Sequence, residues 1–126
     1  MLRRDVGRAS ILVVEDTVEV RELLLELLQE AGYAVVGAED GLRAVQAMSS
    51  IQPSLVLLDL SLPGQSGASV LSWMASNPRT ERIPVVVLSA SPKVIPPEAR
   101  AQVKGILDKP FDLDDLLRMV ENAVAE

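Results

Sequence analysis

The sequence predicts a single α/β domain in which a parallel β-sheet carries helices on both faces. Short apolar runs of strand length alternate along the chain with segments of helical periodicity, the pattern of a doubly wound sheet. The runs at 10–14, 54–58 and 83–88 are apolar almost throughout, as expected for strands that helices cover on both sides. A length of 126 residues fits one domain with a substantial core.

Strands and helices are expected in strict alternation, which implies right-handed crossovers between parallel strands. The strands are expected at 10–14, 33–38, 54–58, 83–88 and 104–107. The helices are expected at 17–31, 41–51, 66–76, 97–102 and 112–124.

Individual residues support the predicted ends of two helices and weaken the prediction of a third. Gly32 follows the first helix as a stop signal, and Asp112 can cap the last helix. The helix at 97–102 has the weakest support, because Pro92, Pro96 and Pro97 stand within six residues and forbid a regular helix through the segment 91–97 that leads into it.

The amino-acid composition excludes several classes of function. The net charge is −6, which argues against direct nucleic-acid binding because that needs a basic face. Cysteine and histidine are both absent, which excludes disulfides, thiol chemistry and the usual general base. No apolar run approaches the roughly 18 residues of a membrane span, so we expect a cytoplasmic protein without a membrane segment. Residues 1–9 are expected to form a solvated tail before a domain at 10–126.

Charged and polar side chains gather at the predicted carboxyl ends of the strands. Glu15 and Asp16 follow the first strand, and Asp59 ends the third. Ser89 and Lys109 follow the fourth and fifth strands. Ligands of doubly wound sheets bind beyond this edge. Carboxylates at close range repel, so the three acids predict a divalent cation or shifted pKa values.

These motifs resemble the receiver domain of bacterial two-component response regulators. The matching segments are Ile11–Asp16, Asp59–Gly67, Ser89–Ala90 and Lys109–Phe111. Their order and spacing fit the family over nearly the whole chain. The resemblance implies a flavodoxin-like, doubly wound sheet of five parallel strands in the order 2-1-3-4-5, flanked by helices, with the fourth helix short or irregular here.

The resemblance also implies a phosphoacceptor site. Asp59 would accept a phosphoryl group from a phosphohistidine on a sensor histidine kinase or a histidine phosphotransfer protein. Mg²⁺ would be bound by Asp16 and Asp59 directly, by Glu15 through water, and by the backbone carbonyl of Ser61. Such a domain is not an enzyme in the usual sense, since it catalyses only its own phosphoryl transfer and dephosphorylation.

Two further residues have implied roles. Lys109 would neutralise charge on the transferring phosphoryl group, and the Ser89 hydroxyl would donate a hydrogen bond to it. In the family the peptide bond between Lys109 and Pro110 is usually cis.

The first helix is expected to receive the phosphodonor. Its core stripe is predicted to consist of Val20, Leu24, Leu27, Leu28 and Ala31. Val18 and Leu25 are expected to point away from that stripe. In receivers, which this chain resembles, the phosphodonor docks on the first helix beside the acidic residues. Docking of the partner on Val18, Leu23 and Leu25 is one interpretation; the other is that they are ordinary exposed apolar residues.

One position departs from the family pattern. Ile106 stands where phosphorylated receivers usually carry an aromatic ring that couples to the Ser/Thr hydroxyl. Ile106 could simply pack at the sheet edge, but we favour the view that the usual switch is absent. We then expect at most one helical turn starting near Pro97, and a response confined to the loop after Ser89.

Two other functions compete with the receiver. A degenerate receiver-fold module could bind partners without phosphorylation, but the intact acids, Ser89 and Lys109 speak against it. A phosphohydrolase with an aspartyl nucleophile generally needs a further acid two residues past the nucleophile, and this chain has Ser61 there.

Overall fold

The computed structural model describes residues 9–62, 67–90 and 95–125. Five parallel strands form one sheet in the order β2-β1-β3-β4-β5, which confirms the predicted topology. The strands are β1 (Ser10–Val14), β2 (Ala34–Ala38), β3 (Leu55–Asp59), β4 (Val85–Ser89) and β5 (Val103–Asp108).

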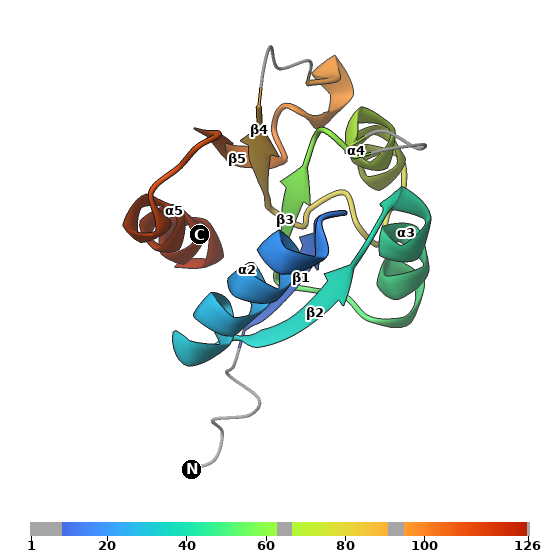
Figure 1. Cartoon of the computed structure of the whole chain (residues 1–126). Coiled ribbons are helices and arrows are strands. Elements are labelled where there is room, and N and C mark those ends of the chain that lie inside the picture. Colours follow the sequence, from blue (N-terminus) through green and yellow to red (C-terminus); the bar gives the residue numbers. More distant parts are fainter. Residues whose placement is uncertain (1–8, 63–66, 91–94, 126) are drawn as a thin grey trace.

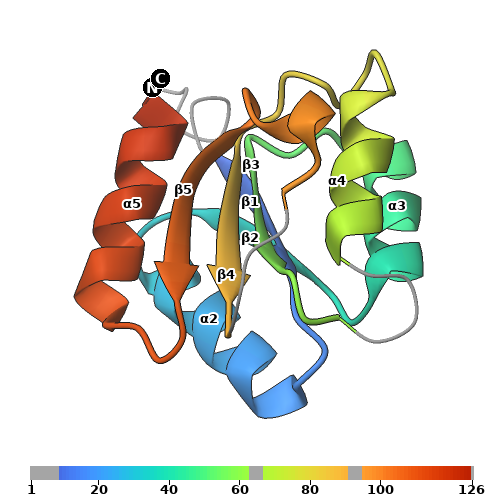
Figure 2. The same ribbon diagram turned by 90° about the horizontal axis from the view of Figure 1, so that it is seen from above.

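Helices cover both faces of this sheet (Figure 1). The helical elements are α2 (Val18–Glu30), α3 (Gly41–Ser50), α4 (Gly67–Ala75), the 3-10 helix η1 (Pro97–Ala99) and α5 (Leu113–Ala125). Helices α2 and α5 lie on one side, and α3 and α4 lie on the other, as the view from above also shows (Figure 2).

The alternation of side chains along each central strand builds two cores. Leu12 and Val14 of β1 face the core shared with α3 and α4, whereas Ile11 and Val13 face the core shared with α2 and α5. All four are at most 1% exposed. The central strands are therefore apolar on both faces, which explains why their sequences show no polar alternation.

Several helix ends follow the expected rules. Gly32 has a φ of 104° directly after α2, a conformation that glycine adopts without strain. The Asp40 side chain accepts a hydrogen bond of 2.8 Å from the backbone N–H of Arg43 at the start of α3. The Asp112 side chain does the same for the N–H of Asp114 at 2.7 Å, before α5.

The fourth helix is reduced to one turn, η1, as predicted. It begins at Pro97, a position where a missing backbone N–H costs little. Glu98 accepts a hydrogen bond of 2.9 Å from the Ser72 hydroxyl of α4, and Ala99 is fully buried. The Gln102 amide donates a 2.5 Å hydrogen bond to the carbonyl of Thr80. The loop expected to respond after Ser89 includes residues 91–94, which lie outside the described residues.

The first helix differs from prediction at two residues. Leu25 does not point away from the core but is half-buried and packs against it, because it fills the space left above Gly37 of β2. Ala31 was expected in the core stripe but is exposed where the helix ends. Val18 and Leu23 are 44% and 48% exposed. They are the members of the predicted docking set that face solvent.

No helix within residues 9–62, 67–90 and 95–125 combines the length and the apolar character needed to cross a membrane.

Candidate functional site

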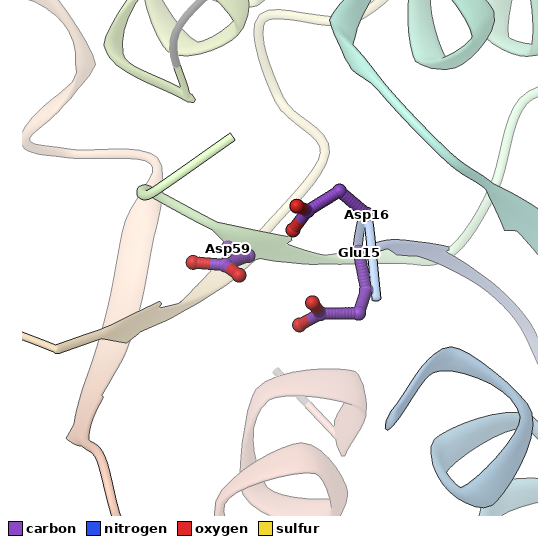
Figure 3. Close-up of side chains that lie close together, drawn as sticks. All are labelled: Glu15, Asp16 and Asp59. Atoms are coloured by element: carbon purple, nitrogen blue, oxygen red, sulfur yellow. The ribbon is translucent and has the colours of Figure 1, made fainter. Parts of the chain in front are cut away.

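Two neighbouring strands bring the acidic residues together. Val14 is paired with Leu58 in the β1–β3 register, so the residues that follow each strand emerge side by side. Glu15, Asp16 and Asp59 each place one carboxylate oxygen within 4.8 Å of the others. The three carboxylates surround one small space (Figure 3). Glu15 and Asp59 are buried, while Asp16 opens this space to solvent.

Hydrogen bonds restrain both the backbone and one carboxylate oxygen of Glu15, while its other carboxylate oxygen accepts none among the described residues. Its backbone N–H donates to the carbonyl of Ala38 at 3.0 Å, and its Oε2 accepts from the N–H of Thr17 at 3.1 Å. Its Oε1 is buried and has no hydrogen-bond partner among residues 9–62, 67–90 and 95–125. Burial raises the pKa of the Glu15 carboxyl to about 7, and the negative charge of Asp59 adds to the rise.

Lys109 is the cation of this site. Its Nζ donates to Asp59 Oδ2 at 2.8 Å and lies 3.8 Å from Glu15 Oε1, too far for a hydrogen bond. Partial burial lowers the pKa of Lys109, but the hydrogen bond and the charge of Asp59 outweigh this effect and the pKa is raised. The backbone N–H of Lys109 donates to the carbonyl of Ser89 at 2.8 Å, and the peptide bond to Pro110 is cis, as the resemblance implied.

The two serines of the predicted site occupy different positions. Ser89 ends β4 and is 3% exposed, next to the β3 end in the sheet. Ser61 is exposed in the turn after β3, and its backbone N–H donates to Asp59 Oδ1 at 2.8 Å. Both oxygens of the Asp59 carboxylate therefore accept hydrogen bonds, Oδ1 from the turn and Oδ2 from Lys109.

The residues present fit a divalent cation. The site offers three carboxylates, and hard oxygen ligands are those that Mg²⁺ prefers. The buried Glu15 Oε1 supports this assignment, because Lys109 reaches it only at 3.8 Å and a buried carboxylate oxygen without a hydrogen bond is costly unless a cation or ordered water meets it.

Sequence reasoning missed Arg21. Its guanidinium Nη1 donates a 2.8 Å hydrogen bond to the backbone carbonyl of Glu15. The only signal in the sequence was a basic residue within the first helix, shortly after two acids. That signal does not reveal a contact to a backbone carbonyl, which depends on how α2 packs on the sheet.

Comparison with known proteins agrees with this geometry. The response regulator receiver domain family matches residues 11–121. Protein Rrf1 of Nitratidesulfovibrio vulgaris is 36% identical over 93% of this chain and 83% of its own length. The transcriptional regulatory protein PdtaR of Mycobacterium tuberculosis is 39% identical over 91% of this chain, but the match spans only 56% of PdtaR.

A solved structure shows the same architecture. The response regulator TrrA of Thermotoga maritima, in complex with Mg(2+)-BeF, superimposes with a TM-score of 0.79 and 31% identity, covering 91% of this chain and 98% of TrrA. Family match, relatives and fold agree, and the chain belongs to the response regulator receiver domain family.

Proposed function

We propose that this chain is a phosphoacceptor receiver domain that takes a phosphoryl group from a phosphohistidine onto Asp59. The observation that carries the proposal is the setting of Asp59. Its carboxylate is buried among Glu15 and Asp16 and accepts a 2.8 Å hydrogen bond from Lys109. The proposed domain spans residues 10–126.

The proposed transfer is a displacement at phosphorus. A carboxylate oxygen of Asp59 forms a P–O bond as the P–N bond to the donor imidazole breaks, and the imidazole nitrogen keeps the electron pair. The new acyl phosphate carries a charge of about −1.5 to −2 if it titrates as protein phosphates do. Lys109 is placed to neutralise part of it, and we propose that the Ser89 hydroxyl donates to a phosphoryl oxygen.

Asp16 and Asp59, with Glu15 through water and the carbonyl of Ser61, are the proposed Mg²⁺ ligands. When bound, Mg²⁺ supplies positive charge that offsets the repulsion between the acids and the phosphoryl oxygens. TrrA, solved with Mg(2+)-BeF, supports the choice of metal. We expect Asp16→Asn to weaken Mg²⁺ binding strongly and Glu15→Gln to weaken it less. Equal affinity in wild type and Asp16→Asn by titration calorimetry would contradict the ligand assignment.

We propose that this chain acts in the cytoplasm and that its binding partners are proteins. A histidine kinase or histidine phosphotransfer protein would dock beside the site, where Val18 and Leu23 of α2 are exposed. Leu25 can contribute only its accessible part, because it packs against the core. With a net charge of −6, direct contact with nucleic acid or an anionic membrane is not proposed.

Intact-mass measurement after incubation with Mg²⁺ and a small phosphodonor tests the function. A single added phosphoryl group in the wild type, and none in Asp59→Asn, is the expected result. No phosphorylation would favour the interaction module that acts without phosphate. Continuous consumption of donor, without accumulation of the phosphorylated form, would favour a phosphohydrolase.

A further inference from the structure

We infer that Arg21 is a positioning residue that fixes the Glu15–Asp16 turn for cation binding, and that Gly37 provides the space through which Arg21 reaches that turn. This inference rests on the proposed function, because it concerns the proposed Mg²⁺ site. Neither residue belongs to the motifs that define the site, and neither contacts a carboxylate of the cluster in the described structure.

The geometry starts from the position of Arg21 in the first turns of α2. Its backbone N–H donates to the carbonyl of Thr17 at 2.8 Å, as in any helix. Its side chain turns back toward the end of β1, where Nη1 meets the Glu15 carbonyl at 2.8 Å. Among the described residues no carboxylate lies within 4.0 Å of this half-buried guanidinium. Its charge therefore serves the turn rather than a local ion pair.

The Glu15 carbonyl belongs to the peptide group that joins Glu15 to Asp16. Fixing this carbonyl fixes the plane of that peptide, and hence the direction in which Asp16 leaves β1. The side chain of Glu15 already bridges to the N–H of Thr17. Two hydrogen bonds therefore restrain this short turn: one from the Thr17 N–H to the Glu15 side chain, and one from the Arg21 guanidinium to the Glu15 carbonyl. A charged donor makes the stronger kind of hydrogen bond, so the contact from Arg21 restrains the Glu15 carbonyl more firmly than a neutral donor would.

Gly37 explains how the Arg21 side chain can lie along the sheet. A methyl group at Gly37 would lie 3.3 Å from Arg21 Cδ and 3.5 Å from its Cγ, and 3.0 Å from Leu25 Cδ1. A side chain at this position of β2 would require both Leu25 and the stem of Arg21 to shift by a few tenths of an ångström. Gly37 pairs with Val13, close to the strand end that carries Glu15. The missing side chain therefore opens the route from α2 to the turn.

The first test compares Arg21→Ala with Arg79→Ala. Arg79 is a matched control, because its Nη1 also donates to a backbone carbonyl, that of Ser49 at 3.4 Å, far along the chain from the acids. Mg²⁺ affinity by calorimetry should fall about tenfold in Arg21→Ala, as for groups that orient metal ligands. It should be unchanged in Arg79→Ala. Wild-type affinity in Arg21→Ala, while the wild type binds Mg²⁺, overturns the inference alone; failure of the wild type to bind Mg²⁺ contradicts the proposed function instead.

A second readout needs no metal. The Thr17 amide is held by Glu15 Oε2, so its hydrogen exchange reports on the turn. In the metal-free protein, exchange of this amide should become about fivefold faster in Arg21→Ala, as expected for loss of one supporting hydrogen bond. An unchanged rate in a folded variant would show that Arg21 does not hold the turn.

A double-mutant cycle tests Gly37. Gly37→Ala should lower Mg²⁺ affinity in the wild-type background by displacing Arg21. It should have no further effect in the Arg21→Ala background, where the stem is gone. Equal losses in both backgrounds would show that Gly37 acts independently of Arg21, and would overturn the coupling.

Discussion

Glu15 is the residue whose stability contribution the structure predicts most sharply. Its pKa is about 7 in the folded chain against an ordinary value of 4.5, so the folded state binds the proton more tightly than the unfolded state does. Its contribution to stability is therefore largest at low pH and declines as the pH rises from about 4.5 to about 7. Above pH 7 the buried carboxylate is ionised and its cost is constant.

Glu15→Gln should remove this pH dependence. With a metal chelator present, the variant is expected to exceed the wild type in unfolding free energy by about 2 kcal/mol at pH 8, and by much less at pH 5. Urea denaturation at the two pH values measures the difference. The glutamine oxygen can still accept from the Thr17 N–H, so that hydrogen bond is a constant in the comparison. A variant less stable than wild type at pH 8 would contradict the assigned burial cost.

Some residues of the site could be predicted from the sequence, and others could not. Asp59, Lys109 and the acids after β1 could be named because the ends of parallel strands meet at one edge. Arg21 could not, because its partner is a backbone carbonyl whose position depends on the packing of α2 over β2. Leu25 was misplaced for the same reason, since helical periodicity does not reveal the gap that Gly37 leaves in the neighbouring strand.

At the scale of elements, Gly67 sets how closely α4 can approach the end of β3. A methyl group there would lie 2.6 Å from Leu60 Cα and 2.9 Å from the Asp59 carbonyl oxygen. Both are backbone atoms, which cannot move aside independently. Alanine is intrinsically better than glycine in a helix, but this overlap should outweigh the gain. We predict that Gly67→Ala destabilises the protein by about 1–3 kcal/mol and slows phosphorylation of Asp59.

Gly105→Ala is the matched control for that prediction. A methyl group at Gly105 would overlap the side chain of Met119 on α5, which is flexible and can rotate away. Its effect on phosphorylation should be small, because Gly105 and Met119 lie outside the acidic cluster. The comparison uses unfolding free energies and rates of phosphorylation by a small donor. Unchanged phosphorylation in Gly67→Ala would show that the α4–β3 approach does not position Asp59.

The short η1 predicts an unusual response. Ile106 is 38% exposed and, with Ile95, Arg100 and Val103, lines a hollow of about 280 Å³ beside β5. Within the part of the chain that the structure describes, η1 is the helical element between Ser89 and β5, and Ile106 stands at the position of the usual ring. We predict that a phosphoryl mimic with Mg²⁺ increases the protection of amides from hydrogen exchange within residues 89–105, mainly in the part that precedes η1 in the sequence. Gln102, already anchored to Thr80, should change little.

Hydrogen exchange with and without the mimic measures this response. Identical exchange in both states, or strong protection typical of a regular helix in both, would contradict it. The brevity of this element was predictable from its prolines. The anchoring of this element was not predictable, because the Ser72–Glu98 and Gln102–Thr80 hydrogen bonds join residues 26 and 22 positions apart, respectively.

For the whole molecule, the sheet order and the two apolar cores followed from the alternation of strands and helices and from the family resemblance. The boundaries of elements shifted by a residue or two where the register decides them. In β5, for example, the register is interrupted opposite Val85 and Val86, and the strand begins at Val103 instead of the expected 104. Such irregularities depend on pairing with the neighbouring strand and leave little trace in the local sequence.

The central claim concerns the whole molecule: the carboxyl ends of the parallel strands present Asp59 as the phosphoacceptor. The most direct measurement is to phosphorylate the protein in Mg²⁺, reduce the acyl phosphate with borohydride and map the modified peptide by mass spectrometry. We predict a single modification at Asp59, none in Asp59→Asn, and none in wild type kept in chelator. A phosphoryl group found on Ser61 or Ser89, or an Asp59→Asn variant labelled as well as wild type, would contradict the account.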